Sequence, residues 1–152
     1  MLKWSVVVVV TGAAFAAPAP AWAYKIFVSN EGDNTMSVID SETMAVVQTV
    51  PVGQRPRGIT MTKDGKFVLL CASDDDTVQI IDATTYEIVG TLPSGPDPEL
   101  FVLHPSGNPL YIANEDDNLV TVVDVEKRSL VTEIPVGVEP EGMGISPDGK
   151  VM

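Results

Sequence analysis

An ungapped repeat of 42 residues constrains this sequence more than any other feature. Residues 24–65, 66–107 and 108–149 align without a gap. Self-similarity at this period is typical of repeat architectures, in which each copy is one supersecondary unit. Seven columns are identical in all three copies: Asp33/Asp75/Asp117, Asp40/Asp82/Asp124, Val47/Val89/Val131, Pro51/Pro93/Pro135, Gly53/Gly95/Gly137, Pro56/Pro98/Pro140 and Gly65/Gly107/Gly149.

Each copy predicts four short strands separated by turns. In the first copy the apolar or alternating runs are Lys25–Ser29, Met36–Asp40, Ala45–Val50 and Gly58–Thr62. The Asp-Gly pair at 64–65 favours a tight hairpin, because glycine adopts a positive φ without strain. Asp40 opens another turn, in which we expect its carboxylate to accept a hydrogen bond from the backbone N–H two residues on.

Four strands in a unit of about 40 residues predict an all-β fold, a β-propeller of four-stranded antiparallel blades. A parallel β-helix usually has shorter rungs, and a β-sandwich does not repeat its loop chemistry in register. The phase of the repeat implies that the first blade lacks its innermost strand. Three units are fewer than the four to eight blades of a ring. We therefore expect a partial propeller over 24–152, in which a fourth unit starts at Lys150.

The open edges of such a partial ring lead to two expectations. Either the chain is the N-terminal part of a longer protein, or it is the product of a truncated gene. In the second case its unpaired strand edges would favour self-association, because an edge strand presents free N–H and C=O groups.

The first 23 residues predict a secretory signal peptide. Lys3 supplies the positive start, Val6–Val10 an apolar core and Ala21–Ala23 an A-x-A cleavage site. The apolar stretch before Pro18 is shorter than the ~20 residues that span a bilayer. We expect cleavage after Ala23, a periplasmic or secreted protein, and no membrane attachment afterwards.

Charge and cysteine content exclude several classes of partner. The chain has 9 Lys and Arg against 21 Asp and Glu, a formal net charge of −12. Because phosphate backbones repel such a chain, we expect no nucleic-acid partner. One Cys and one His exclude an intrachain disulfide and a metal site built mainly from these residues. Cys71 lies in an apolar run, which predicts a small buried hydrophobe.

Several motifs recur in the strands and in the loops between them. The sequence resembles the YVTN family of β-propeller repeats in the segments Ile26–Asn30, Val38–Asp40, Leu110–Asn114, Val122–Asp124, Ile134–Gly137 and Pro140–Gly149. The middle copy departs from this pattern, with Leu70-Cys71-Ala72 in place of the asparagine ending. The resemblance implies the fold and says almost nothing about activity.

A narrower resemblance rests on Val50–Gly58, Pro93–Leu100 and Ile112–Val120. These blocks are similar to exported propellers associated with PQQ-dependent alcohol catabolism. The resemblance implies a periplasmic accessory role, about seven blades in the complete ring, and no assigned catalytic residue. Both tryptophans leave with the signal peptide, so the tryptophan-docking signature of quinoprotein propellers is missing. We expect no cofactor in this chain.

The best candidate site is the loop that enters each innermost strand. A proline is constant in this loop, at Pro56, Pro98 and Pro140, while the flanking charges vary between copies. Such loops ring the channel mouth of a propeller, so the varying charges predict a binding rim for a small ligand or a periplasmic protein. The alternative is a set of solvated charges in weak salt bridges between blades, worth ~0–1 kcal/mol each. The rim residues are Arg55, Arg57, Asp97, Glu99, Glu139 and Glu141.

The acidic hairpin loops offer the alternative site. Asp33, Asp75 and Asp117 lie in loops rich in carboxylates, which are the ligands of hard cations such as Ca²⁺. None of these loops has the spacing of a calcium loop, and recurrence in every copy fits turn chemistry better. We therefore expect no metal.

These observations favour an exported, non-enzymatic propeller that binds a partner or acts as a scaffold. One alternative is a fragment of a propeller enzyme, lactonase-like or haem d1-like, whose active site needs further blades. The other alternative is a truncated product without function.

Overall fold

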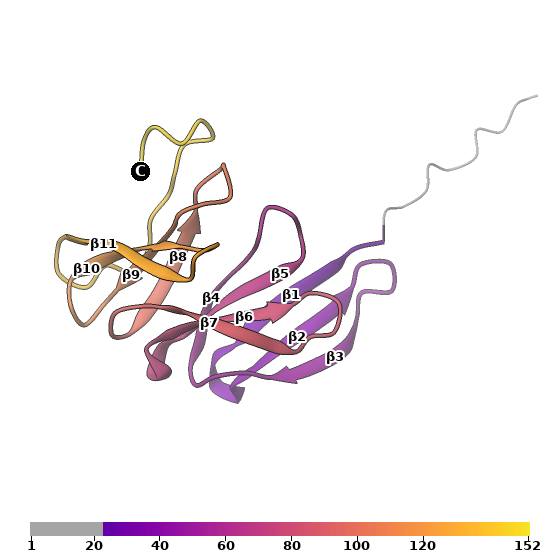
Figure 1. Ribbon diagram of the computed structural model, residues 1–152. Helices are drawn as coiled ribbons and strands as arrows, with labels where there is room; N and C mark the ends of the chain where they lie inside the picture. The colour runs from indigo at the N-terminus through magenta and orange to yellow at the C-terminus, as the bar shows by residue number, and fades with distance from the viewer. Residues whose placement is uncertain (1–22) are drawn as a thin grey trace, which may run out of the picture.

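The computed structural model describes residues 23–152, and the predicted signal peptide lies outside them apart from Ala23. Eleven strands form three antiparallel sheets that stand next to one another (Figure 1). None of the described helices is long and apolar enough to cross a membrane. The all-β fold with successive antiparallel sheets confirms the predicted propeller architecture.

The three sheets are named here as blades. Blade 1 contains β1 (Lys25–Asn30), β2 (Thr35–Asp40) and β3 (Ala45–Pro51). Blade 2 contains β4 (Pro56–Met61), β5 (Phe67–Ala72), β6 (Thr77–Asp82) and β7 (Ile88–Pro93). Blade 3 contains β8 (Pro98–Leu103), β9 (Leu110–Asn114), β10 (Leu119–Asp124) and β11 (Ser129–Pro135). The 3₁₀ turns η1 (Glu31–Asp33) and η2 (Ser73–Asp75) join β1 to β2 and β5 to β6.

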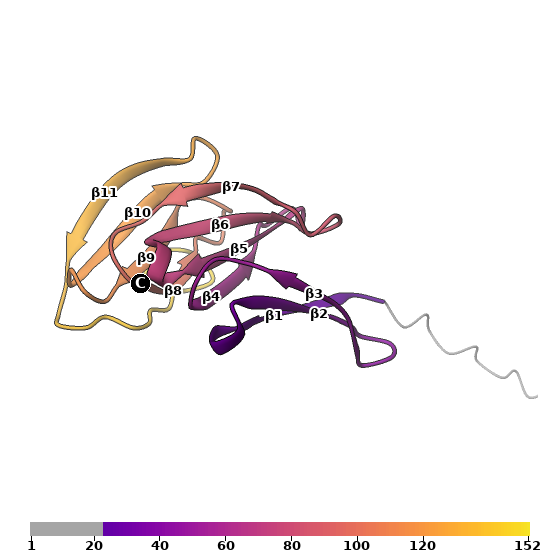
Figure 2. The same cartoon turned by 90° about the horizontal axis from the view of Figure 1, so that it is seen from below.

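The order of strands confirms the predicted phase of the repeat. Blades 2 and 3 run β4-β5-β6-β7 and β8-β9-β10-β11, whereas blade 1 is the three-stranded sheet β1-β2-β3. Within the described residues β1 pairs only with β2, so its other edge has no strand. Figure 2 shows blades 2 and 3 spreading apart toward their outer strands β7 and β11.

At Gly58 the innermost strands of blades 2 and 3 approach so closely that there is no room for a side chain at this position. A Cβ added to Gly58 in β4 would lie 2.8 Å from the carbonyl oxygen of Glu99 in β8. Real Cβ atoms do not approach backbone this closely, so glycine is required here. This contact brings the start of β8 against β4, which matters for the site described below.

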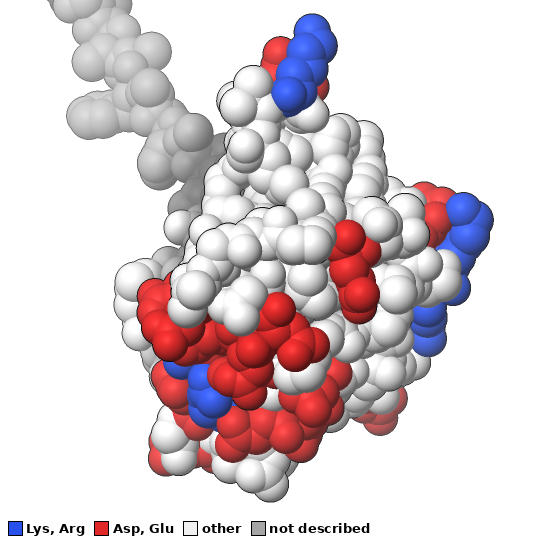
Figure 3. All heavy atoms as spheres, turned by 90° about the vertical axis from the view of Figure 1, so that its left-hand side faces the viewer, with Lys and Arg blue, Asp and Glu red and all other residues white. Residues whose placement is uncertain are grey.

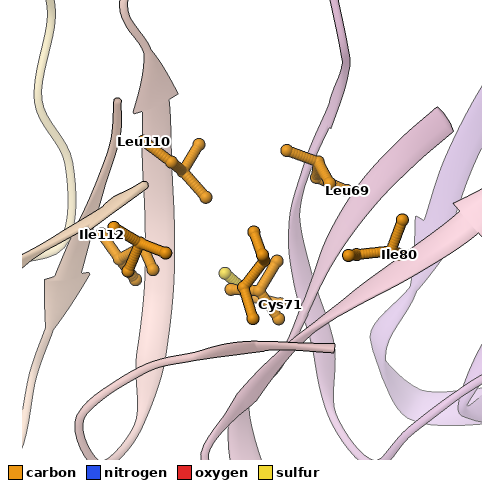
Figure 4. Packing of buried hydrophobic residues seen from close by; sticks show 8 residues of the cluster. Leu69, Cys71, Ile80, Leu110 and Ile112 are labelled. Carbon is orange, nitrogen blue, oxygen red and sulfur yellow. The ribbon is translucent and has the colours of Figure 1, made fainter. Parts of the chain in front are cut away.

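The hydrophobic core lies between the blades, and β5 contributes to both sides of blade 2. Because successive strand residues point to opposite faces, Val68 and Leu70 pack toward blade 1. Leu69 and Cys71 pack toward blade 3, where Ile112 meets them (Figure 4). The run is therefore apolar at every position, as expected of a strand covered on both faces.

Cys71 is fully buried, which confirms the prediction that it acts as a small core residue. Burial raises the pKa of its thiol, and the neighbouring charge of Glu99 adds to this effect. The thiol is therefore held in its neutral, unreactive form.

The turns repeat in backbone geometry as well as in sequence. All nine described non-glycine residues with a positive φ fall into three columns of the 42-residue repeat: Asn34/Asp76/Asn118, Met44/Tyr86/Arg128 and Arg55/Asp97/Glu139. Gly65 has a φ of 70°, as the predicted hairpin requires. The carboxylate of Asp40 accepts hydrogen bonds from the backbone N–H groups of Glu42 and Thr43, and Asp82 does the same in blade 2. The predicted aspartate turn is thereby confirmed.

The packing between blades predicts where truncation is costly. Ile112→Ala should lower the free energy of unfolding by about 2–5 kcal/mol, because it leaves a cavity in the core between blades 2 and 3. Val131 on the outer strand β11 is 58% exposed, and Val131→Ala should cost less than about 0.5 kcal/mol. Urea unfolding followed by far-ultraviolet circular dichroism measures both. Equal effects of the two substitutions would contradict the assigned core.

Candidate functional site

The loops that enter the innermost strands have one backbone geometry, held by one recurring hydrogen bond. The side chain of Asn34 accepts a hydrogen bond from the backbone N–H of Arg55 at 2.9 Å. Asp76 and Asn118 receive the equivalent bonds from Asp97 at 3.1 Å and Glu139 at 2.9 Å. A short polar side chain at the first position tolerates its own positive φ and fixes the facing loop. Residues 55, 97 and 139 are thus presented in the same way in successive units.

We call the face that carries these loops, together with the β1–β2, β5–β6 and β9–β10 connections, the loop face. On it, Arg55 stands at the centre of a network of ion pairs. Its Nη2 lies 2.6 Å from Oε1 of Glu99 and 3.0 Å from Oδ1 of Asp97. Its Nη1 lies 3.3 Å from Oδ1 of Asp74, and its Nε lies 3.7 Å from Oε1 of Glu31. The guanidinium therefore joins carboxylates that blades 1, 2 and 3 contribute.

Arg57 completes the network from the other side of Glu99. Its Nε lies 2.5 Å from Oε2 of Glu99, and its Nη1 lies 3.6 Å from Oε1 of Glu31. Each carboxylate oxygen of Glu99 thus faces a different arginine. Glu99 itself is completely buried. A buried carboxylate held by two guanidinium groups is a rigid arrangement, because moving either arginine leaves a charge without compensation.

The pKa values of Glu99 and Arg55 are both raised, but for different reasons. Burial raises the pKa of the Glu99 carboxyl; Arg57 and Arg55 oppose the shift, while Glu115 and Asp97 reinforce it. Burial alone would lower the pKa of Arg55, but Asp97, Glu99 and Asp74 together raise it above its ordinary value. Arg55 is therefore held as a cation, whereas burial opposes the ionisation of Glu99.

Four of the six predicted rim residues come together: Arg55, Arg57, Asp97 and Glu99. Glu139 and Glu141 are exposed on the same face, and the ion pairs found within residues 23–152 do not include them. Sequence reasoning missed Glu31, Asp74 and Glu115 as members of the network. Their acidic loops had been assigned to a separate candidate site, whereas the fold places these loops directly beside the rim.

The metal candidates lie apart from one another. Asp33, Asp75 and Asp117 occupy equivalent loops of three successive repeats, and Asp75 accepts a hydrogen bond from the backbone N–H of Gln54 at 2.8 Å. Within the described residues, the carboxylates that do gather within 4.8 Å belong to Asp97, Glu99 and Glu115. The two arginines already neutralise Glu99 at this place, so the trio is better described as part of the ion-pair network than as a cation site.

The loop face concentrates most of the negative charge of the molecule. It carries twelve carboxylates against two arginines, a formal balance of −10, and Figure 3 shows carboxylates crowded around a small basic group. The remaining described lysines and arginines lie on other parts of the surface. The twelve carboxylates are Glu31, Asp33, Asp74, Asp75, Asp76, Asp97, Glu99, Glu115, Asp116, Asp117, Glu139 and Glu141.

Repeated antiparallel blades of up to four strands are the architecture of a β-propeller. A model of the YNCE-like beta-propeller family matches residues 2–99. The chain therefore belongs to the YNCE-like β-propeller family. None of the curated proteins matches it.

The solved structures with a similar fold belong to longer chains than this one. Hydrazine synthase of Kuenenia stuttgartiensis has a TM-score of 0.78 and 26% identity over 83% of this chain, which spans 37% of the enzyme chain. A functionally unknown protein from Desulfotomaculum acetoxidans DSM 771 has a TM-score of 0.67 and 18% identity, over 76% of this chain and 39% of its own. The dihydro-heme d1 dehydrogenase NirN, solved in complex with DHE, has a TM-score of 0.62 and 20% identity, over 73% of this chain and 24% of its own. The chain thus spans less than half the length of each of these proteins.

The raised pKa of Glu99 predicts a pH-dependent contribution to stability. A carboxyl that binds its proton more tightly in the folded state stabilises the fold most below its unfolded pKa of about 4.3. That contribution is lost as the pH rises through the higher folded pKa. The free energy of unfolding of the wild type, minus that of Glu99→Gln, should therefore decrease as the pH is raised from about 4.3. Urea titrations at a series of pH values measure the difference.

Glu141→Gln is the matched control, because it removes the same charge from an exposed position on the same face. If the Glu99→Gln difference changes with pH no more than the difference for this control, the raised pKa of Glu99 is wrong.

Proposed function

We propose that this chain is part of an exported, non-enzymatic β-propeller that binds a protein partner through its loop face, as an accessory of periplasmic PQQ-dependent alcohol oxidation. The observation that carries the binding role is the charge of −10 gathered on one face of a regular scaffold. The blocks Val50–Gly58, Pro93–Leu100 and Ile112–Val120 support the association with PQQ-linked oxidation, because they resemble the exported propellers of that process.

Two features of the loop face support a protein partner with a Lys- and Arg-rich surface. Its exposed carboxylates lie on short turns with repeated backbone geometry, so a docking surface is preorganised. Its two arginines are held by ion pairs with neighbouring carboxylates, which leaves the outer acidic side chains to face solvent. Electrostatic complementarity of this kind governs association rate and partner choice.

The proposal predicts salt-sensitive binding to a purified PQQ-dependent alcohol dehydrogenase. Asp116 and Glu141 are exposed on the loop face, and their carboxylates take part in none of the hydrogen bonds or ion pairs described above. The double variant Asp116→Asn, Glu141→Gln should weaken binding about five-fold or more at low ionic strength. The effect should shrink as salt is raised, because screening removes interactions between exposed charges. Surface plasmon resonance with the chain immobilised measures the dissociation constants of the wild type and of the double variant at each salt concentration.

Glu42→Gln with Glu87→Gln is the control, because it removes the same total charge from exposed turns at the other ends of the strands. This variant should bind within two-fold of the wild type. Absence of binding by the wild type contradicts the PQQ-linked role. Equal weakening by the two double variants contradicts the loop face as the docking surface.

A further inference from the structure

A cavity of about 350 Å³ lies between blades 2 and 3, at the opposite ends of the strands from the loop face. Its floor is apolar, formed by the partly exposed Phe67 of β5 and Val125 just after β10, and backed by the buried Leu69 and Ile80. Its mouth is formed by the β4–β5, β8–β9 and β10–β11 turns. An apolar floor with a few charged groups at the rim is the usual construction of a small-molecule site, and the volume falls in the usual range.

Two cations cross the interface at this cavity in opposite directions. Lys63 extends from the β4–β5 turn of blade 2, and its Nζ donates a hydrogen bond to the carbonyl oxygen of Pro105 in blade 3 at 3.0 Å. Arg128 extends from the β10–β11 turn of blade 3 back to blade 2. Its guanidinium lies against Gly90 in β7, where a Cβ would collide with Nη1. Both groups line the cavity, so positive charge meets its opening from two sides.

These two cations differ from all others in the described part of the chain. Of the eight lysines and arginines within residues 23–152, six have a carboxylate oxygen within 4.0 Å. Lys63 and Arg128 are the two that have none, in a chain of 21 acidic residues. Asp64 and Glu126 also line the cavity. The carboxylate of Asp64 is engaged by the hydroxyl of Thr62 and the ammonium of Lys66. Glu126 is exposed at the edge of the cavity, and none of the ion pairs within residues 23–152 joins it to Lys63 or Arg128. The cavity therefore offers two cations that no acidic side chain neutralises by contact.

The repeat supplies an internal comparison with the interface between blades 1 and 2. There Tyr86 stands in the column of Arg128, and Phe27 in the column of Leu69. The rings of Tyr86 and Phe27 pack edge to face with their centroids 6.2 Å apart. A smaller hollow of about 150 Å³ beside Phe27 lies toward β4 and is not lined by Tyr86. At the interface of blades 2 and 3, Leu69 and Arg128 replace the aromatic pair, and the guanidinium lies at the edge of the cavity.

We propose that this cavity is a binding site for a small organic anion with an apolar body, such as a medium-chain carboxylate. The apolar part lies on Phe67 and Val125, and the carboxylate meets Arg128 and Lys63. A guanidinium pairs with a carboxylate in a planar, two-point geometry, whereas it has no such interaction with an alcohol. The site is separate from the loop face and does not depend on the function proposed above.

Isothermal titration calorimetry with octanoate, 1-octanol and octylammonium tests this assignment on the full chain. Wild type should bind octanoate at least ten-fold more tightly than 1-octanol, and octylammonium more weakly still. Arg128→Gln should weaken octanoate binding at least five-fold while changing 1-octanol binding less than two-fold. Arg128→Tyr, which restores the residue of the filled interface, should abolish binding of both.

Lys127→Gln is the charge-matched control, because Lys127 neighbours Arg128 in sequence but pairs with Asp124 at 2.7 Å and does not line the cavity. It should leave octanoate binding within two-fold of the wild type. The proposal is overturned if octanoate shows no saturable binding, if 1-octanol binds as tightly, or if Lys127→Gln acts like Arg128→Gln. Circular dichroism melting establishes whether each variant is folded. If Arg128→Tyr does not fold, the binding of octanoate and 1-octanol by Arg128→Gln tests the proposal alone.

Discussion

The structure depends on one constraint: a blade is apolar on both faces, so each face must be covered by a neighbouring blade. β5 shows this most directly, with Val68 and Leu70 buried against blade 1 and Leu69 and Cys71 against blade 3. Stability in such an array is approximately a sum of the stabilities of the units and of their interfaces. The interfaces are therefore the places where a change of side chain has structural consequences.

The same constraint separates the repeated scaffold from the features that vary. Positive φ angles recur in fixed columns, and one side-chain hydrogen bond holds each loop that enters an innermost strand. On this constant backbone a single column can carry either sign of charge, as Arg55 and Asp97 do. Because successive units are adjacent in space, such a difference becomes a direct ion pair between them. Another column carries Tyr86, which packs on Phe27, or Arg128, which lines the cavity between blades 2 and 3.

The two ends of the strands differ in how their charged side chains are paired. On the loop face, Arg55 and Arg57 hold the buried carboxylate of Glu99, and further carboxylates surround them. Such a buried pair is maintained by mutual compensation, since loss of one partner leaves a charge in a poorly solvated place. At the opposite ends of the strands, Lys63 and Arg128 meet an apolar cavity without a carboxylate partner. One scaffold therefore presents an acidic surface and, at the other ends of its strands, a small pocket with two cations that have no carboxylate within 4.0 Å.

Much of the fold could be predicted from the sequence, because its signals are local. Alternation of apolar residues marks strands, Asp-Gly pairs mark hairpins, and the position of the first run within the repeat predicts that blade 1 lacks its innermost strand. The rim was partly predictable, since the charges beside Pro56 and Pro98 stand out against a constant proline. These signals need no knowledge of what lies across an interface.

The membership of the ion-pair network and the cavity could not be predicted in this way. Glu31, Asp74 and Glu115 reach the rim only because the connections between strands lie beside the loops that enter the innermost strands. The cavity is lined by Leu69 of blade 2 and by Arg128 of blade 3, whose guanidinium lies against Gly90, and these residues are far apart along the chain. The sequence by itself determined the strands, the turns and their repetition, since these depend on neighbouring residues. Only the tertiary structure decided which side chains meet, because that depends on the angle and distance at which one blade packs on the next.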